Sequence, residues 1–462
     1  MVVLAAAAAA AQIANNYFEA LPPASTAVAP KAPPPPEIPN VPFAPARNVH
    51  VEAMVSIKDF SLLGPWAPLW LGNKAVALLG TRRGRVTMLA WYGEDFSNSR
   101  VVADAQTVQG GAILDMAISR DARRLAIAAA GGDKLQIWLR DTHSSAPATV
   151  IATIDGHCDK AGVAWLDADT LAVGALLHPG TPPPASESAI IGPAQQVPAA
   201  PPAPRRSLYI VRTDAKQAPA AMAPDCLGSL DPVTLTWGPG GRYAVGQNDE
   251  QAQWALLDRT KAVCQAIRLT GIVPTGFIEW EEKSRSFLFT AVPVGSPDPG
   301  HIAVMEYTIA THKARLLASP ATAAVYVGGG KVAVLGSRRL NAAAMAANPE
   351  ALFPAEIAWV DPMQSELNIV PTGFLSTAAE LLHAHLRYSA AKGLVATSFQ
   401  TPHPKAPFTV LMWLSAAGHN GGVLGTGRLG SMLESWSPDG SQLAVLAGLP
   451  DHPTLAIVAA PQ

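Results

Sequence analysis

One short pattern recurs along almost the whole chain: an apolar, β-compatible run, a polar or glycine-containing turn, and a second apolar run. The clearest copy is 433–446, LESWSPDGSQLAVL. Its Pro438-Asp439-Gly440 has the composition of a tight turn, because proline presets φ, aspartate bonds its own backbone and glycine accepts a positive φ. The pattern predicts repeated strand–turn–strand units. Further copies are 68–79, 116–127, 163–173, 235–245, 278–289, 325–335 and 385–396.

The spacing of these copies predicts the architecture. Most equivalent first-strand positions follow one another at intervals of roughly 40–50 residues, and each interval holds four short β-compatible runs. Some intervals between these positions are longer, and they include the Pro/Ala/Ser-rich insertion 178–204 and the insertion 339–354. This pattern is typical of an all-β fold, the β-propeller, with eight blades preferred and seven as the alternative. The positions used are Trp70, Met116, Trp165, Trp237, Trp280, Val327, Leu386 and Trp436.

The two ends of the repeat array predict how it closes. The last unit starts at Met432 and has only three strands before the chain ends. A spare strand, 50–57, precedes the first complete unit. Because an unpaired edge strand invites aggregation, we expect residues 50–57 to supply the fourth strand of the last blade. The propeller is therefore predicted to span residues 49–462.

The N-terminal region has a different composition. Residues 1–20 are alanine-rich and are predicted to form a helix, a membrane anchor or the remnant of a signal peptide. Residues 21–48 form a Pro/Ala-rich linker that includes 33–36, PPPP, and favours an extended arm. Helix and arm together are expected to tether the protein to a neighbouring protein or to a membrane.

Three segments resemble a known superfamily. Residues 135–141, LQIWLRD, look like the third strand of a WD repeat, and Gly156-His157 before 163–165 look like its passage to the next blade. Residues 436–445, WSPDGSQLAV, match the pattern that TolB-type propellers repeat. The chain thus resembles the WD-repeat and TolB-type β-propellers over about residues 50–460. The resemblance implies a ring fold that usually presents surfaces to partners.

Composition limits the partners and the compartment. The formal net charge is −2 with 15% charged residues and no basic stripe, so nucleic acid is not an expected partner. Cys158, Cys226 and Cys264 have no metal or haem spacing, and pairing of Cys226 with Cys264 is left open. The Ala-rich start and the Pro/Ala linker are typical of bacterial envelope proteins, which predicts a periplasmic location, with the cytoplasm as the alternative.

A search for catalytic and binding motifs predicts no catalytic, cofactor or metal site. The chain has no GxSxG elbow and no phosphate-binding loop. His383 and His385 share one strand face but lack further ligands. Three carboxylates flank or adjoin Trp280, and a solvated turn is the simpler interpretation. Gly328–Gly330 is interpreted as a hairpin turn, and the first-strand tryptophans as core. The three carboxylates are Glu279, Glu281 and Glu282.

These observations favour a non-catalytic scaffold, the structural or interaction subunit of a larger and membrane-associated complex, and not an enzyme. Other protein subunits would bind the loop faces and the N-terminal arm. The alternative is a metal-assisted hydrolase or lactonase with its site in the propeller funnel, which predicts acidic or histidine side chains converging there. A third hypothesis, a small-ligand or glycan-binding propeller, requires aromatic residues on exposed loops.

Overall fold

The computed structural model describes most of the chain and divides it into two compact units. Unit 2 is Ala103–Ile267, and unit 1 comprises the residues before and after it. The predicted helix 1–20, most of the 21–48 linker and most of both insertions lie outside the described residues. The described residues are 41–461 without 64–66, 179–203, 215–216, 223–229, 249–252, 296–301, 338–347, 349, 362–365, 378–379, 382–383, 403–406, 418–419 and 429–431.

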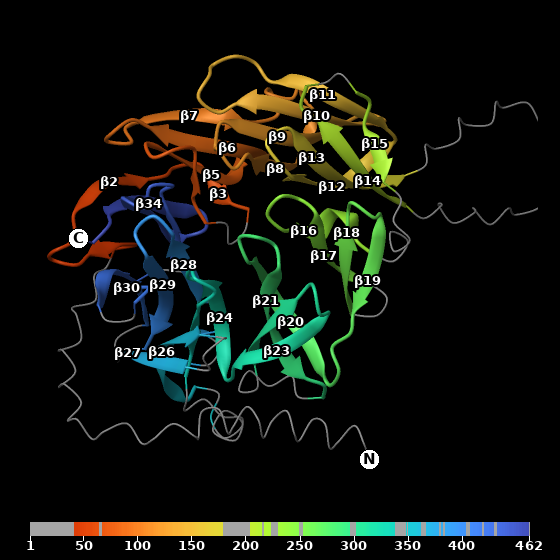
Figure 1. Ribbon diagram of the computed structural model, residues 1–462. Coiled ribbons are helices and arrows are strands. Elements are labelled where there is room, and N and C mark those ends of the chain that lie inside the picture. Colours follow the sequence, from red (N-terminus) through yellow and green to blue (C-terminus); the bar gives the residue numbers. More distant parts are fainter. Residues whose placement is uncertain are drawn as a thin grey trace, which may run out of the picture. The chain divides into compact units, whose positions relative to one another are not determined.

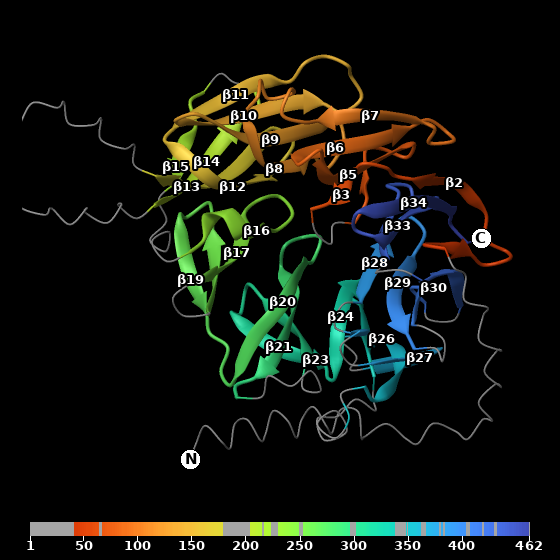
Figure 2. The same cartoon turned by 180° about the vertical axis from the view of Figure 1, so that it is seen from behind.

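Eight antiparallel sheets confirm the predicted eight-bladed β-propeller (Figures 1 and 2). Unit 2 holds blades 2 to 4. Blade 2 is β8 (Ala112–Ile118), β9 (Arg124–Gly131), β10 (Lys134–Asp141) and β11 (Thr149–Asp155). Blade 3 is β12 (His157–Trp165), β13 (Thr170–His178), β14 (Arg205–Arg212) and β15 (Ala220–Met222). Blade 4 is β16 (Thr236–Trp237), β17 (Tyr243–Asn248), β18 (Gln253–Asp258) and β19 (Val263–Ile267), preceded by the 3-10 helix η1 (Pro232–Thr234).

Unit 1 holds the other five blades. Blade 1 is β4 (Leu69–Trp70), β5 (Ala75–Arg82), β6 (Arg85–Tyr92) and β7 (Asn98–Ala103), with β3 (Ser61–Leu62) also on β5. Blade 5 is β20 (Ile272–Trp280), β21 (Ser286–Pro293), β22 (Ala303–Thr308) and β23 (Lys313–Ala318). Blade 6 is β24 (Ala321–Tyr326), β25 (Val332–Gly336), β26 (Leu352–Asp361) and β27 (Glu366–Thr377). Blade 7 is β28 (His385–Ser389), β29 (Leu394–Thr401), β30 (Phe408–Ser415) and β31 (Gly421–Gly427). Blade 8 is β32 (Leu433–Trp436), β33 (Gln442–Leu449) and β34 (His452–Ala459), completed by β2 (Val51–Ser56).

Blade 8 closes as the sequence predicts. The spare strand β2 pairs antiparallel with β34, so the beginning and the end of the described chain share one sheet (Figure 1). The short strand β1 (Ala44–Pro45), inside the predicted linker, pairs with β31 of blade 7. Phe43 is 2% exposed and packs into the core between blades 7 and 8. Residues 41–47 therefore lie against the folded blades.

Three of the tryptophans at first-strand positions contact a neighbouring blade; of the five interpreted as core, Trp70 is buried and the other four are partly buried. Their indole Nε1–H groups donate to a carbonyl oxygen in the first strand of the preceding blade in three places, at 2.9–3.0 Å. Within each unit this bond adds a polar contact to the apolar faces between blades. The pairs are Trp165 to Ala117, Trp436 to Arg387, and Trp70 to Ser435.

The turn between the first two strands of a blade is built by local side chains. In blade 8, Ser437 Oγ donates to Asp439 Oδ1 at 2.7 Å and accepts from the Gln442 N–H at 3.0 Å. Gly440 has φ of +68°, and a Cβ there would lie 2.3 Å from Ser389 Oγ. The predicted turn therefore forms, and glycine is required by both its conformation and its close neighbour.

The described residues contain no helix that is long and apolar enough to span a membrane.

Candidate functional site

One carboxyl group is completely buried in the first strand of blade 8. Glu434 on β32 is 1% exposed, and its Oε1 has no hydrogen-bond partner among the described residues. Burial raises the pKa of this carboxyl to about 7, although the nearby Arg387 guanidinium and a hydrogen bond from Ser398 act in the opposite direction. A carboxyl with this pKa exchanges its proton near neutrality, as a general acid or base requires.

The hydrogen bonds of Glu434 are consistent with a protonated carboxyl. Ser398 Oγ on β29 lies 2.9 Å from Glu434 Oε2 and 2.8 Å from the carbonyl oxygen of Met432. One hydroxyl proton cannot serve two acceptors with full strength. If Glu434 carries a proton on Oε2, it donates to Ser398, which in turn donates to Met432. The neutral form of Glu434 therefore completes the chain of hydrogen bonds.

A second carboxyl and an arginine belong to the same group. Glu279 is the penultimate residue of β20 and is partly buried, whereas the sequence favoured a solvated turn for it. Burial raises the pKa of Glu279, and Arg387 partly offsets the shift. The charge of Arg387 thus lowers the pKa of both carboxyls, and the three residues belong to the first strands of blades 5, 7 and 8 in unit 1.

The other residues that the sequence singled out as candidates do not all belong to this group. His385 on β28 is the register partner of Ser398, and it lies on the same strand face as Arg387. His383 lies outside the described residues. Glu281 follows β20 and accepts the N–H groups of Lys283 and Arg285, so it belongs to the turn. Gly328–Gly330 all have positive φ and form the predicted hairpin turn in blade 6.

Sequence reasoning missed Glu434 and Arg387. The signal that could have found Glu434 is its position: it is a carboxylate inside the apolar first strand of an otherwise regular repeat, LESW. A buried ionisable residue in such a strand costs free energy unless it is paired or neutral, and it therefore indicates either a structural network or a function.

A second polar cluster lies at the base of the 178–204 insertion in unit 2. His157 and His178 occupy paired positions on β12 and β13, and their Nε2 atoms lie 2.8 and 2.9 Å from the two carboxylate oxygens of Asp159. The ring centroids are 6.0 Å apart. All three side chains are partly exposed to solvent, so this cluster ties β12 to the strand that leads into the insertion.

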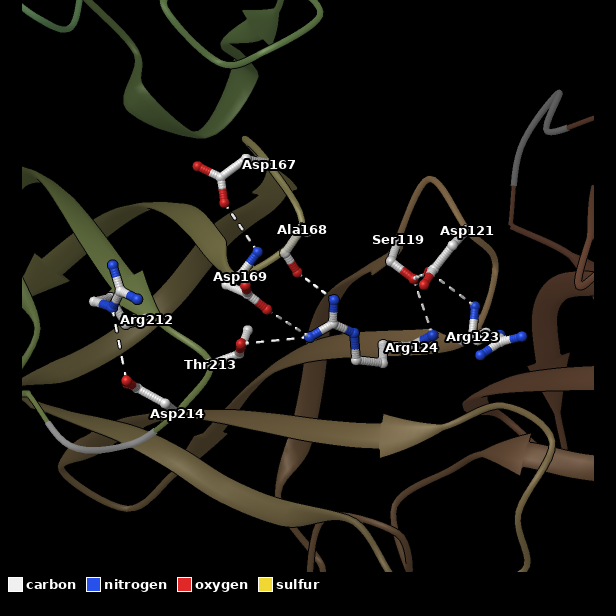
Figure 3. Close-up of polar contacts among 10 residues, drawn as sticks. All are labelled: Ser119, Asp121, Arg123, Arg124, Asp167, Ala168, Asp169, Arg212, Thr213 and Asp214. Carbon is white, nitrogen blue, oxygen red and sulfur yellow. Dashed lines mark hydrogen bonds and ion pairs between the residues drawn. The ribbon is translucent and has the colours of Figure 1, made fainter.

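A third polar group joins blades 2 and 3 at the end where the first and second strands of each blade meet (Figure 3). Arg124 on β9 reaches across to blade 3, where it contacts the Ala168 carbonyl oxygen, Asp169 Oδ1 at 3.2 Å and Thr213 Oγ1 at 3.5 Å. Its guanidinium carbon lies 5.0 Å from the centroid of the Trp165 ring. Because every partner of its guanidinium belongs to blade 3, the Arg124 side chain links the two blades.

Exposed apolar side chains of unit 1 gather at one end of its blades. We call the end where the first and second strands join the turn end, and the opposite end the loop end. Within the described chain, seven of the ten exposed large apolar residues lie at loop ends of unit 1, and none lies at a turn end of that unit. The seven are Val41, Leu63, Val273, Val294, Leu352, Leu375 and Leu449.

The structure also bears on metals and cysteines. No group of three or more His, Cys, Asp or Glu residues in the described part of the chain is arranged to hold a metal ion. Cys264 is in a disulfide bond, and Cys158 is a buried free thiol. Cys226 lies outside the described residues.

Comparison with known proteins identifies the fold and no family. No family model and no curated protein matches the sequence. Among solved structures, the chain is similar to oligogalacturonate lyase from Vibrio parahaemolyticus, with 11% identity, 92% of this chain and 98% of that chain covered, and a TM-score of 0.50. It is also similar to the Dos1 propeller, with 11% identity, 89% of this chain and 95% of that chain covered, and a TM-score of 0.49. A third similar structure is a TolB from Agrobacterium tumefaciens, with 11% identity, 79% of this chain and 95% of that chain covered, and a TM-score of 0.34. At this identity, the likeness to the lyase concerns the fold alone.

One prediction needs correction. The chain was expected not to be an enzyme because it lacks a recognisable catalytic set. The lyase that matches over 92% of this chain contradicts that expectation, because it is an enzyme with the same fold. Since fold alone does not determine function, the propeller architecture does not exclude catalysis.

Proposed function

We propose that this chain is an interaction subunit of a larger protein complex and that the loop ends of its unit 1 blades bind the partner. The observation that supports this proposal is the one-sided distribution of exposed apolar side chains in unit 1. Single exposed apolar residues are ordinary on protein surfaces, but their restriction to one end of the blades is not expected from folding alone.

The structure explains why the two blade ends differ in this way. The turn ends are short and fixed by local hydrogen bonds, such as those of Ser437 and Asp439. At the loop ends of blade 6, β26 and β27 extend beyond β25 and carry Leu352 and Leu375, which are 46% and 47% exposed. Removing these side chains from water on binding would contribute roughly 1–2 kcal/mol each.

A partner-capture experiment tests the proposal. A variant with Val294→Ser, Leu352→Ser and Leu375→Ser is compared with the unchanged protein for capture of partners from native extracts and membranes. The matched control, Val150→Ser with Val263→Ser, alters two residues of similar exposure on outer strands of unit 2. Loss of the same partner proteins only in the first variant supports the proposal. Equal capture by both variants contradicts it.

A second comparison addresses the predicted arm. Because Phe43 is buried and β1 pairs with β31, a truncation should remove only residues 1–40 and keep 41–47. We propose that residues 1–40 supply a tether to a membrane or a second partner, on the periplasmic side of a bacterial envelope. Loss of membrane association without loss of the loop-end partner supports separate roles for the arm and the blades.

A second candidate function is hydrolysis at the first strands of unit 1. The observation that favours it is that burial raises the pKa of two carboxyls there, the partly buried Glu279 and the fully buried Glu434. A screen of esters and lactones with the unchanged protein and Glu434→Gln distinguishes this function from the scaffold. Activity that Glu434→Gln abolishes, while partner capture is unchanged, supports hydrolysis.

A further inference from the structure

The hairpin between β5 and β6 carries three exposed arginines at the loop end of blade 1. Arg82 and Arg85 are paired positions of the two strands, and Arg83-Gly84 form the turn between them with φ of +53° and +73°. Two positive φ values in succession match a type I′ turn, which usually takes asparagine and glycine. Like charges at paired positions destabilise a hairpin, and a positive φ is uncommon for arginine. Folding alone therefore does not explain these three residues.

Backbone contacts join this hairpin to the loop end of blade 8. β3 pairs with β5 just before the hairpin, and the Leu62 N–H donates to the Pro450 carbonyl oxygen at 2.9 Å. Pro42 lies against the same turn of blade 8, because a Cβ on Gly448 would be 3.3 Å from Pro42 Cβ. These contacts make one continuous surface of unit 1, which we call the blade 8–1 face. It consists of residues 41–42, 57–63, 80–86 and 448–453.

The blade 8–1 face combines exposed apolar side chains with an excess of positive charge. Val41, Leu63 and Leu449 are 43%, 46% and 42% exposed. The face also exposes four basic and two acidic side chains, although the whole chain has a formal net charge of −2. These are Lys58, Arg82, Arg83, Arg85, Asp59 and Asp451. Apolar side chains beside basic ones are the composition of surfaces that lie on anionic bilayers.

We propose that the blade 8–1 face binds the surface of a membrane that contains anionic lipids. The guanidinium groups bind lipid phosphates, and the apolar side chains enter the boundary between headgroups and acyl chains. A membrane is favoured over an acidic protein because residues 1–14 carry no charged side chain and the chain that follows them reaches Val41 on this face. Two weak contacts with one membrane reinforce each other, since the first raises the local concentration of the second.

Vesicle binding by the full chain tests the proposal. Cosedimentation compares vesicles of phosphatidylcholine alone with vesicles of equal parts phosphatidylcholine and phosphatidylglycerol. We expect tighter binding to the anionic vesicles, and weaker binding to them at high salt, because salt screens exposed charges. Absence of binding, or equal binding to the two kinds of vesicle, overturns the proposal.

An arginine variant assigns the charge effect to the hairpin. It carries Arg82→Gln, Arg83→Gln and Arg85→Gln, and it should bind anionic vesicles about 100-fold more weakly. A matched control removes three exposed arginines at turn ends, Arg120→Gln, Arg123→Gln and Arg285→Gln. Residues 1–40 are the same in both, so the difference reports the folded face. Equal vesicle binding overturns the proposal, and loss of a captured protein without loss of vesicle binding identifies an acidic protein partner instead.

An apolar variant tests the other half of the face. Leu63→Ser with Leu449→Ser should weaken binding to both kinds of vesicle about 10-fold, because apolar insertion does not depend on headgroup charge. Its control is Val150→Ser with Val263→Ser, of similar exposure in unit 2. Binding equal to that of this control overturns apolar insertion. Neither variant alters the residues of blades 5 and 6 that the partner-capture experiment changes, so membrane binding and partner binding can fail separately.

Discussion

Carboxyl groups in the first strand of a blade and in the turn that follows it behave in opposite ways. In three blades the carboxyl on the strand has a raised pKa and the carboxyl of the turn has a lowered pKa. The pairs are Asp115 and Asp121 in blade 2, Glu279 and Glu281 in blade 5, and Glu434 and Asp439 in blade 8.

The difference follows from the donors around each carboxyl. For Asp439, burial alone would raise the pKa, but the Ser441 N–H and the hydroxyls of Ser437 and Ser441 outweigh it. For Glu434, burial dominates, because Oε1 finds no donor among the described residues. Asp439 is therefore a charged structural group, whereas Glu434, with a pKa of about 7, changes its charge near neutral pH.

The largest expected effect is the pH dependence of stability caused by Glu434. Its pKa is raised from 4.5 to about 7 on folding, so its stabilising contribution is complete below pH 4.5 and is lost as the pH rises through 7. At about 1.4 kcal/mol per pH unit, the loss amounts to about 3 kcal/mol. We expect the difference in unfolding free energy between the unchanged protein and Glu434→Gln to fall by this amount from pH 4.5 to pH 7.

Guanidinium chloride unfolding, followed by tryptophan fluorescence at several pH values, measures this difference. A matched control is Glu282→Gln, which alters a carboxylate in the turn of blade 5. A difference that stays constant between pH 4.5 and pH 7 would show that Glu434 is ionised in the folded protein. The contrast between strand and turn carboxyls would then fail in blade 8.

The next largest effect concerns the turn carboxylates. Asp439→Ala removes hydrogen bonds from Ser437 and from both donors of Ser441, so we expect a loss of about 2 kcal/mol at pH 7. Because the folded pKa of Asp439 is lowered, its stabilisation is present above pH 4 and disappears as the pH falls below the folded value. Asp121→Ala in blade 2 should show the same sign. Unfolding curves at pH 7 and pH 3 test both, and an effect that grows at pH 3 contradicts the sign.

The sequence predicted the blades much better than it predicted these sites. The repeat around 433–446 determined strands, turn and spacing, because strand periodicity and turn chemistry are local properties. The environment of Glu434 is not local: Ser398 and Arg387 come from another blade. For the same reason Glu279 was placed in a turn, although β20 continues through it. Only the packing of whole blades distinguishes a buried carboxyl from an exposed one.

Arg124 should have a smaller effect on stability than the turn carboxylates. It links blades 2 and 3 through Ala168, Asp169 and Thr213 (Figure 3), and its guanidinium also lies over the Trp165 ring. Its side chain is 27% exposed, so solvent weakens these contacts. We expect Arg124→Met, which keeps the aliphatic stem, to cost about 1 kcal/mol. The cost should decrease in high salt, and a loss above roughly 3 kcal/mol would show that Arg124 is essential to the packing of the two blades.

Arg212 in the same region provides the smallest expected effect and the sharpest control. It lies at the end of β14. In Figure 3 its guanidinium is joined to Asp214, and Arg212 Nε lies 3.8 Å from Asp214 Oδ2. Its side chain is 48% exposed, and an exposed pair at this distance contributes about 0–0.5 kcal/mol. Arg212→Met should therefore leave the unfolding free energy within error, while Arg124→Met lowers it. Equal losses would mean that net charge, and not the contacts between blades, stabilises this end of unit 2.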